Sequence, residues 1–131
     1  AVRRIESILA EAIISKACGW RIEFLSGGYE SYPINEIADI TRKIHEITGQ
    51  KQWLNIGTLS EDEIKKFVPH LEGLCGAVEC INPEVRMKVC PSKPIEPIEE
   101  MLDIAGESGL KKAITIIIGL GETEEKIPLL M

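Results

Sequence analysis

The sequence lacks long apolar segments and any excess of positive charge, and these two absences exclude whole classes of protein. Uninterrupted apolar runs such as Ile116–Ile118 are far shorter than the roughly 20 residues that a membrane-spanning helix needs. Fifteen Lys and Arg residues stand against 21 Asp and Glu, which gives a net charge of −6 at pH 7. Phosphate contacts need clustered basic side chains, so this balance argues against a dedicated nucleic-acid-binding protein. We therefore expect neither a membrane nor a nucleic acid as a partner.

Signals for export and for metal binding are absent as well. No signal-peptide pattern opens the chain, because Arg3, Arg4 and Glu6 fall within a helical period. The four cysteines form neither a CxxC pair nor a triplet of the iron–sulfur kind. We expect a cytoplasmic protein whose cysteines are reduced and serve mainly as small buried hydrophobic residues. They are Cys18, Cys75, Cys80 and Cys90.

Candidate catalytic side chains are also scarce. Ser26, Cys80 and Thr123 have no histidine near them in the pattern, so no nucleophile–base pair is predicted. His45 and His70 do not follow predicted strands, and we expect both on the surface. No catalytic residue is identified on this basis, which fits a binding cleft whose cofactor supplies the chemistry.

What the chain does contain is a regular alternation of helix and strand over one domain, residues 1–131. The predicted helices run from near the start of the chain to Cys18, from about Pro33 to Gly49, from just after Ser60 to about Pro69, from about Pro97 to Gly109, and from Glu124 onward. Strands are predicted at Arg21–Leu25, Gln52–Ile56, Leu74–Glu79 and Lys112–Ile118, with a long connection at Cys80–Pro94.

This alternation predicts an α/β fold with about four parallel strands and right-handed crossovers. A GxGxxG fingerprint after the first strand is missing, so a partial (β/α) TIM-like barrel is favoured over a doubly wound sheet. The apolar, β-branched run Lys112–Ile118 is expected to be buried. Because the chain opens on a helix and leaves both sheet edges free, we expect a fragment or a chain that self-associates through those edges.

Function in parallel βα folds lies at the carboxyl ends of the strands. Two of these ends carry glycine turns, which let a ligand approach the backbone and predict a ligand cleft. Glu79 closes a strand, where a carboxylate is either exposed at the rim or a ligand for a cation, and its place at the functional face favours the ligand role. Lys88 and Lys93 follow it and are candidates to neutralise an anionic group. Glu30 and Glu122 are equally candidates for helix caps or ligands.

The residues at these strand ends resemble those of the radical S-adenosylmethionine (SAM) superfamily, within its biotin-synthase-like group. That group includes biotin synthase, methylornithine synthase and hydrogenase maturases. The segments that carry the resemblance are Ser26-Gly27-Gly28-Tyr29, Gly57-Thr58-Leu59-Ser60, Glu79-Cys80-Ile81-Asn82-Pro83 and Ile116-Ile117-Ile118-Gly119-Leu120-Gly121-Glu122-Thr123. They are similar to the family's Gly-Gly-Glu motif, its segment after the third strand, its Glu-Thr-x-Asn-Pro stretch and its GxIxGxxE element.

The resemblance implies that the chain is the middle portion of a radical SAM partial barrel. By this resemblance Gly27, Gly28 and Tyr29 hold the methionine end of SAM, and Glu79 contacts its amino group or ribose. The residues implied to face adenine are Gly119, Leu120 and Gly121. The intact enzyme is expected to cleave SAM at a 4Fe-4S cluster, so that a 5′-deoxyadenosyl radical abstracts hydrogen from a small-molecule substrate.

The sequence departs from the family pattern at three places. The cluster-binding CxxxCxxC loop is absent, so the cluster ligands are expected outside this chain, and the chain alone is expected to be inactive. Tyr29 stands where the family has glutamate. Pro97-Ile98-Glu99 stands where some relatives carry an arginine for the SAM carboxylate. Two alternatives remain open: an aldolase- or synthase-type barrel piece that binds phosphate, and a truncated, non-catalytic ligand-binding or interaction module.

Overall fold

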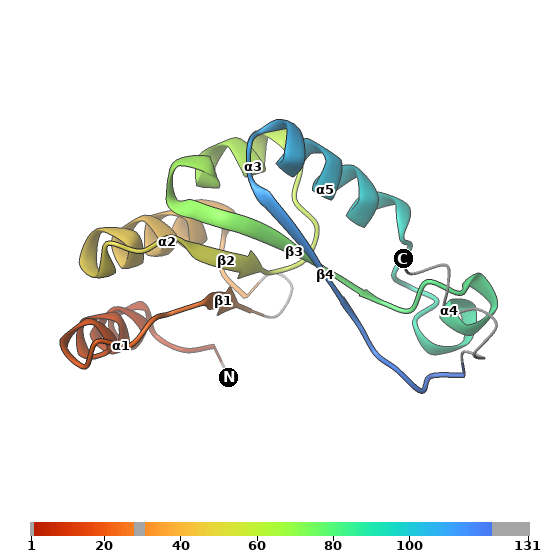
Figure 1. The fold of residues 1–131 in the computed structure, drawn as a ribbon, viewed down its shortest axis with the longest axis horizontal. Coiled ribbons are helices and arrows are strands. Elements are labelled where there is room, and N and C mark those ends of the chain that lie inside the picture. The colour runs from red at the N-terminus through yellow and green to blue at the C-terminus, as the bar shows by residue number, and fades with distance from the viewer. Residues whose placement is uncertain (1, 28–30, 122–131) are drawn as a thin grey trace.

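The molecule is built on one sheet of four parallel strands (Figure 1). The computed structural model describes residues 2–27 and 31–121, and residues 1, 28–30 and 122–131 are not described. The strands are β1 (Phe24–Ser26), β2 (Gln52–Asn55), β3 (Leu71–Glu79) and β4 (Lys111–Ile116). Their spatial order β1-β2-β3-β4 is also their order along the chain.

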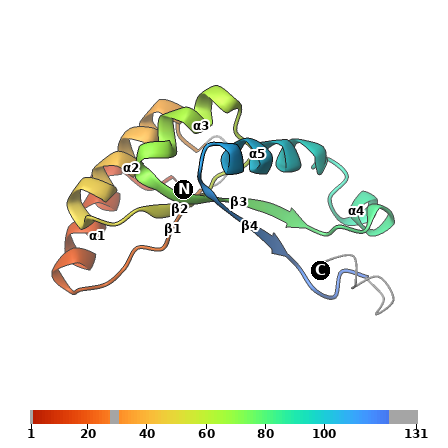
Figure 2. The same cartoon turned by 45° about the horizontal axis from the view of Figure 1, so that its top comes forward.

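The helices connect these strands and cover one face of the sheet. They are α1 (Ile5–Ala17), α2 (Ile34–Thr48), α3 (Glu61–Phe67), α4 (Pro83–Val89) and α5 (Glu96–Glu107). Figure 2 shows α1, α2, α3 and α5 on the same side of the sheet, with α4 beyond the end of β3. Parallel strands in chain order with helices on one face form the wall of a barrel, whereas a doubly wound sheet has helices on both faces. The predicted α/β class and partial barrel are confirmed.

The main core lies between the sheet and α2, α3 and α5. Its buried members are Ile37, Leu54, Leu59, Ile64, Phe67, Leu71, Leu74, Val78, Ile98, Met101, Ala105 and Leu110. Close packing of α5 depends on Gly76 of β3, because a Cβ atom there would lie 2.5 Å from Ile98 Cγ2. A second, smaller core of Ala12, Ile40 and Ile44 joins α1 to α2.

The helix boundaries follow from capping and helix-breaking residues that are visible in the sequence. Ser60 and Glu63 form the predicted capping box, in which the Ser60 N–H donates to Glu63 Oε2 at 2.8 Å. Gly49 ends α2 in the left-handed conformation, with φ +74°. Pro69 lies in a 3₁₀ turn that follows α3 directly, as the prediction of a shortened helix required.

Three predicted boundaries are wrong. β1 spans only Phe24–Ser26, because it is an edge strand that pairs with the four-residue β2 alone. β3 begins at Leu71, three residues earlier than predicted. The connection after β3 contains the unpredicted α4, whose start is capped by the Asn82 side chain accepting from the N–H groups of Glu84 and Val85.

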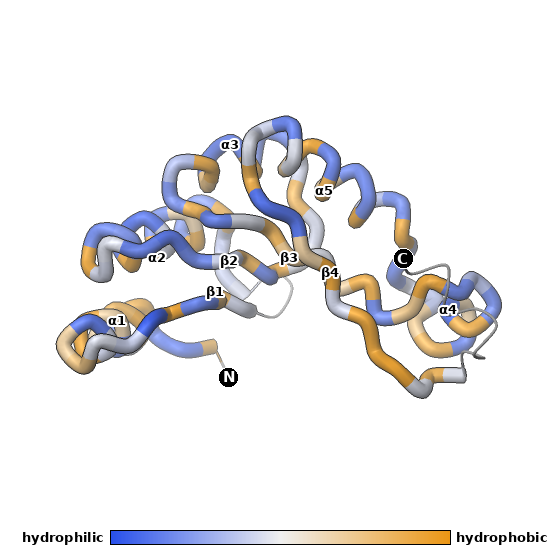
Figure 3. The backbone as a smooth tube through the Cα atoms, viewed as in Figure 1, coloured by the Kyte–Doolittle hydropathy of each residue, from blue (hydrophilic) through white to orange (hydrophobic). Residues whose placement is uncertain are grey.

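The expected burial of the β4 run is also wrong. Ile114 and Ile116 are 48% and 37% exposed, and the end of this strand belongs to a hydrophobic stretch in Figure 3. β4 pairs with β3 along one edge only, and α5 covers it only in part. Cys18, predicted to be buried, is exposed at the end of α1, whereas Cys75 and Cys80 are buried as expected. No helix within the described ranges is long and apolar enough to cross a membrane.

The face of the sheet opposite the helices carries an aromatic pair. Leu25 and Leu54 pack into the helix-side core, so their neighbours Phe24 and Trp53 project from the other face. The two rings stack with centroids 6.2 Å apart. Trp53 has room because Gly73 lies beside it on β3, where a Cβ atom would collide with the Trp53 ring and the Lys111 carbonyl.

The Gly73→Ala substitution is therefore expected to lower the free energy of unfolding by about 1–3 kcal/mol through overpacking. Gly106→Ala is the matched control. Its Cβ would meet only the flexible Lys112 side chain, at 3.4 Å, and alanine is favoured over glycine in a helix by roughly 1 kcal/mol. Urea denaturation checks both variants, and equal stabilities for the two would contradict this account of β3.

The two histidines, predicted to be ordinary surface residues, form a contact at the amino-terminal end of the sheet. His45 of α2 and His70 before β3 are both half-buried, and their Nδ1 atoms lie 3.1 Å apart. Burial, followed by the charge of His45, lowers the pKa of His70. Arg42 and Lys51 lower it further, whereas Glu46 raises it. The pattern missed this contact because His45 and His70 are separated by 25 residues along the chain.

Stability is expected to fall as the pH drops through about 6.5. The folded state binds a proton on His70 less tightly than the unfolded state does, so protons favour unfolding in this window. Thermal unfolding midpoints between about pH 7.5 and 5.5 test this, with His70→Gln as the comparison. The wild-type midpoint should decline more steeply than that of the variant, and identical slopes would refute the assignment.

Candidate functional site

A cleft of about 540 Å³ lies where β1 and β2 end and the segment before α5 passes over them. This volume is within the range of small-molecule sites. The lining residues are Gly27, Asn55, Ile56, Gly57, Thr58, Gly76, Ala77, Ser92, Lys93, Pro94, Pro97, Ile98 and Met101. The cleft therefore occupies the position at the carboxyl ends of the strands that the sequence predicted for a ligand.

Backbone groups at the ends of β1 and β2 shape one side of the cleft. The Gly27 N–H donates to the Asn55 carbonyl at 3.2 Å, so the ladder continues one residue past β1. Gly57 then turns the chain with φ +105°, a conformation that residues with a side chain rarely adopt. The turn leaves Asn55 and Thr58 together at the wall of the cleft.

Glu79 and Lys93 form an ion pair at the edge of the cleft. Lys93 Nζ lies 3.1 Å from Glu79 Oε1, and the two side chains are 40% and 28% exposed. Glu79 has a φ of +65°, the left-handed region that non-glycine residues rarely occupy. The register between β3 and β4 shifts at this same point, between Ala77 and Glu79. The surrounding structure must hold such a strained residue in place, and strained residues cluster at functional sites. The backbone of Glu79 therefore supports a functional role for this strand end.

The buried guanidinium of Arg86, on α4, holds this edge together. It is 7% exposed and binds the carbonyl oxygens of three residues. Nη1 donates to Val78 and, at 2.7 Å, to Cys80, and Nε donates to Lys93 at 3.0 Å. Nη2 also donates to Lys93. One side chain thus ties the residues flanking Glu79 to the backbone of Lys93. Sequence reasoning missed Arg86 because it predicts a long connection at Cys80–Pro94, without the helix α4 that carries this side chain.

The predicted site residues do not all come together at the cleft. Gly27 lines the cleft, and Glu79 is linked to it through Lys93. Gly119, Leu120 and Gly121 do not line this cleft: a Cβ atom on Gly121 would lie 3.7 Å from Val85 of α4. Gly28, Tyr29, Glu30 and Glu122 lie outside the described residues. Lys88, the other candidate cation, is exposed on α4.

A metal site with three or more protein ligands is not formed by the part of the chain that the structure describes. No three His, Cys, Asp or Glu side chains in it are grouped to hold an ion. Cys75 and Cys80 are buried in β3 and directly after it, and burial raises the pKa of the Cys75 thiol, which disfavours the thiolate that binds metals.

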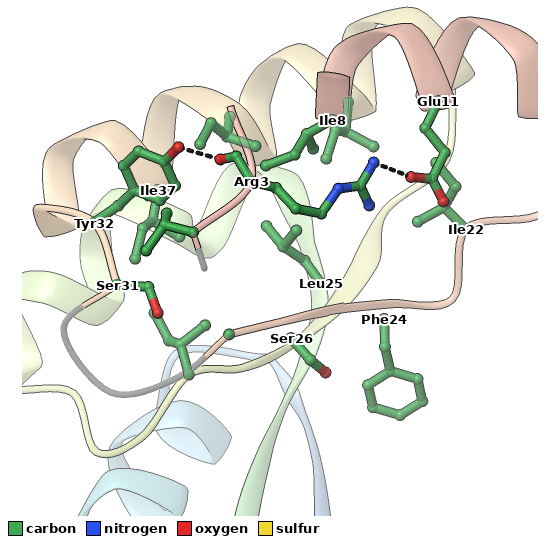
Figure 4. Close-up of a pocket in the computed structure, with 15 residues that line it drawn as sticks. Arg3, Ile8, Glu11, Ile22, Phe24, Leu25, Ser26, Ser31, Tyr32 and Ile37 are labelled. Atoms are coloured by element: carbon green, nitrogen blue, oxygen red, sulfur yellow. Dashed lines mark hydrogen bonds and ion pairs between the residues drawn. The ribbon is translucent and has the colours of Figure 1, made fainter. Parts of the chain in front are cut away.

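A second cavity, of about 420 Å³, lies between α1, β1 and α2 (Figure 4). Its walls are mainly aliphatic, with Ile8, Leu25 and Ile37 among them. Arg3 forms a 2.6 Å ion pair with Glu11 of α1, and the Tyr32 hydroxyl donates to the Arg3 carbonyl. These polar groups satisfy one another, so the cavity offers less to a polar ligand than the cleft at the strand ends does.

Comparison with known proteins finds similarity both in sequence and in structure. The chain is 47% identical over 129 residues to an uncharacterized protein of Methanocaldococcus jannaschii, covering 98% of the chain and 35% of that protein. Its fold is similar to that of methylornithine synthase (PylB), with a TM-score of 0.82 and 16% identity, covering 96% of the chain and 39% of that structure. No family model matches the chain. The chain thus spans little more than a third of either protein.

Replacing Arg86 by Gln is expected to loosen the segment from Cys80 to Pro94, because a shorter amide cannot reach all three carbonyls. Hydrogen exchange should accelerate at the Cys90 and Lys93 amides, whose hydrogen bonds close this segment. Lys88→Gln on the same helix is the control and should leave these rates unchanged. Equal exchange in both variants would show that Arg86 does not hold the segment.

Proposed function

We propose that this chain is the SAM-binding core of a radical SAM enzyme of the biotin-synthase-like group. The observation that carries the proposal is the cleft at the carboxyl ends of the strands, with the Glu79–Lys93 ion pair at its edge. The similarity of fold to methylornithine synthase supports the same barrel arrangement. In this proposal residues 1–131 form the middle portion of a partial barrel, and the substrate is a small molecule.

The residues at the cleft fit the methionine part of SAM. That part carries a carboxylate and an ammonium on one carbon, and the cleft edge offers one ammonium and one carboxylate side by side. Gly27 and Gly57 expose backbone to the cleft, and Glu79 is the group proposed to receive the SAM amino group. When bound and reductively cleaved, SAM supplies a 5′-deoxyadenosyl radical that abstracts hydrogen. The role of this chain is to bind and orient SAM.

The described residues do not fit a 4Fe-4S cluster, because no three candidate ligands come together. We therefore assign no step of the reaction to a cluster held by this chain. The proposal requires that the cluster ligands belong to another part of the complete protein. The adenine contact proposed for Gly119, Leu120 and Gly121 likewise requires a ligand that extends beyond the cleft toward α4.

The same geometry argues against a phosphate site. Lys93 is the lysine among the residues that line the cleft, and its charge is already paired with Glu79. A carboxylate at 3.1 Å from the cation repels a phosphate dianion, whereas it attracts the ammonium of an amino acid group. A zwitterionic ligand therefore suits this edge better than a phosphorylated one.

Glu79→Gln should weaken SAM binding by the complete protein roughly ten- to hundredfold, because a charge-assisted hydrogen bond is lost while the side-chain shape is kept. Isothermal titration calorimetry under anaerobic conditions measures the affinity. Glu72→Gln is the matched control: Glu72 lies on the same strand and is ion-paired with Lys111, at the far end from the cleft. Its SAM affinity should equal that of the wild type.

Two results would reject the proposal. If the wild-type protein binds pyrophosphate and not SAM, the phosphate alternative is correct. If Glu79→Gln and Glu72→Gln bind SAM as tightly as the wild type, the Glu79 edge of the cleft is structural and the ligand lies elsewhere.

A further inference from the structure

The contact between His45 and His70, at the amino-terminal end of the sheet, brings together two ring nitrogens of the kind that bind metal ions. Their Nδ1 atoms lie 3.1 Å apart, and the two rings meet edge to face with an interplanar angle of 63°. Two imidazole nitrogens on one zinc ion, each about 2.0–2.1 Å from it, are about 2.9 Å apart at a right angle and about 3.3 Å apart at a tetrahedral angle. The two Nδ1 atoms therefore already have the separation of a chelating pair.

We propose that His45 and His70 form a site for a divalent transition-metal ion of the class that imidazole nitrogen suits, such as Zn²⁺ or Ni²⁺. The ion takes the place of the proton between the two Nδ1 atoms, and both rings then carry their protons on Nε2. Water fills the other coordination positions, because no third His, Cys, Asp or Glu joins the pair among the described residues. This inference is independent of the SAM proposal, since the pair lies at the opposite end of the strands from the cleft.

Two buried acceptors at the same end of the sheet suit the water that such an ion holds. The Oε1 atoms of Gln50 and Gln52 are buried, and neither accepts a hydrogen bond from the described residues. Gln50 follows the end of α2, and Gln52 pairs in register with Leu71, the residue after His70. A buried acceptor without a donor needs a water or another ligand to satisfy it. Metal-bound water is a hydrogen-bond donor and meets that need.

The charged groups around the histidine pair affect how tightly it holds a cation. Glu46 on α2 attracts a cation at this place, whereas Arg42 and Lys51 repel it. The repulsion from Arg42 is reduced by its ion pairs with Asp39 and Glu46, both at 2.6 Å. Lys51 is exposed before β2, so its charge can be removed without disturbing a packed side chain. Removing that charge should strengthen metal binding.

An ion bound to both rings ties the end of α2 to the start of β3. His45 lies in the last turn of α2, and His70 closes the 3₁₀ turn that leads into β3. The ion thus joins two elements whose histidines are separated by 25 residues along the chain. A ligand that binds only the folded arrangement stabilises it against opening. The Gly49 N–H donates to the His45 carbonyl at 2.7 Å, so its exchange with solvent reports such tightening.

Hydrogen exchange of the complete protein, with and without Zn²⁺, tests the site locally, so that ions bound by cysteines elsewhere do not affect the result. At about pH 7.5, where an ordinary imidazole is neutral, Zn²⁺ at ten times its dissociation constant should slow exchange at Gly49 about tenfold. Mg²⁺, which prefers oxygen ligands, should not. His45→Gln and His70→Gln should each lose the effect. Glu72→Gln, on β3 at the same end of the sheet, should keep it, and Lys51→Gln should show it at a lower Zn²⁺ concentration.

Three results would overturn the inference. Exchange at Gly49 that Zn²⁺ does not slow in the wild type would show that the pair binds no ion. Slowing that persists in either histidine variant would show that the two rings do not act together as ligands. Equal slowing by Zn²⁺ and Mg²⁺ in the wild type would show that imidazole nitrogen is not the ligand, and this comparison decides even where a histidine variant folds poorly. None of these results bears on SAM binding at the cleft.

Discussion

The proposed site depends on the hydrogen bonds of the Arg86 guanidinium, which is buried beyond the end of β3. It gathers carbonyl oxygens from both ends of the segment between β3 and α5, and the Val78 carbonyl also accepts from the Cys80 N–H at 2.8 Å. A buried charge bound only by carbonyls in the described contacts is costly unless its geometry is good, so this segment has little freedom to rearrange. The Arg86 contacts therefore fix the backbone of both residues in the Glu79–Lys93 ion pair.

The parallel sheet then separates the two ends of the molecule by role. At the carboxyl ends of the strands lie the cleft, the glycine turns and the Glu79–Lys93 pair. At the amino ends lie the His45–His70 contact and the ion pair of Glu72 with Lys111, which lowers the pKa of Glu72. These two pairs join neighbouring elements and have no part in the cleft, which is typical of the stability face of a barrel.

Sequence reasoning predicted the parts that depend on local chemistry. The capping box at Ser60, the glycine end of α2 and the strand–helix alternation each rest on residues close together in the chain. It failed where partners distant in the chain decide the outcome. The exposure of Ile114 depends on which elements cover β4. The left-handed Glu79 and the buried Arg86 depend on how the long connection after β3 folds. For the candidate site, the sequence was enough to expect a cleft at the carboxyl ends of the strands and to name Gly27, Glu79 and Lys93. It did not predict the contacts between these residues.

The central claim is that the cleft at the strand ends binds the methionine group of SAM. A crystal structure of the complete protein with SAM, grown without oxygen, tests it most directly. The account predicts the ligand's amino acid group between Glu79 and Lys93, with backbone at Gly27 and Gly57 beside it. SAM bound in the cavity between α1, β1 and α2, or at the amino ends of the strands, would contradict it.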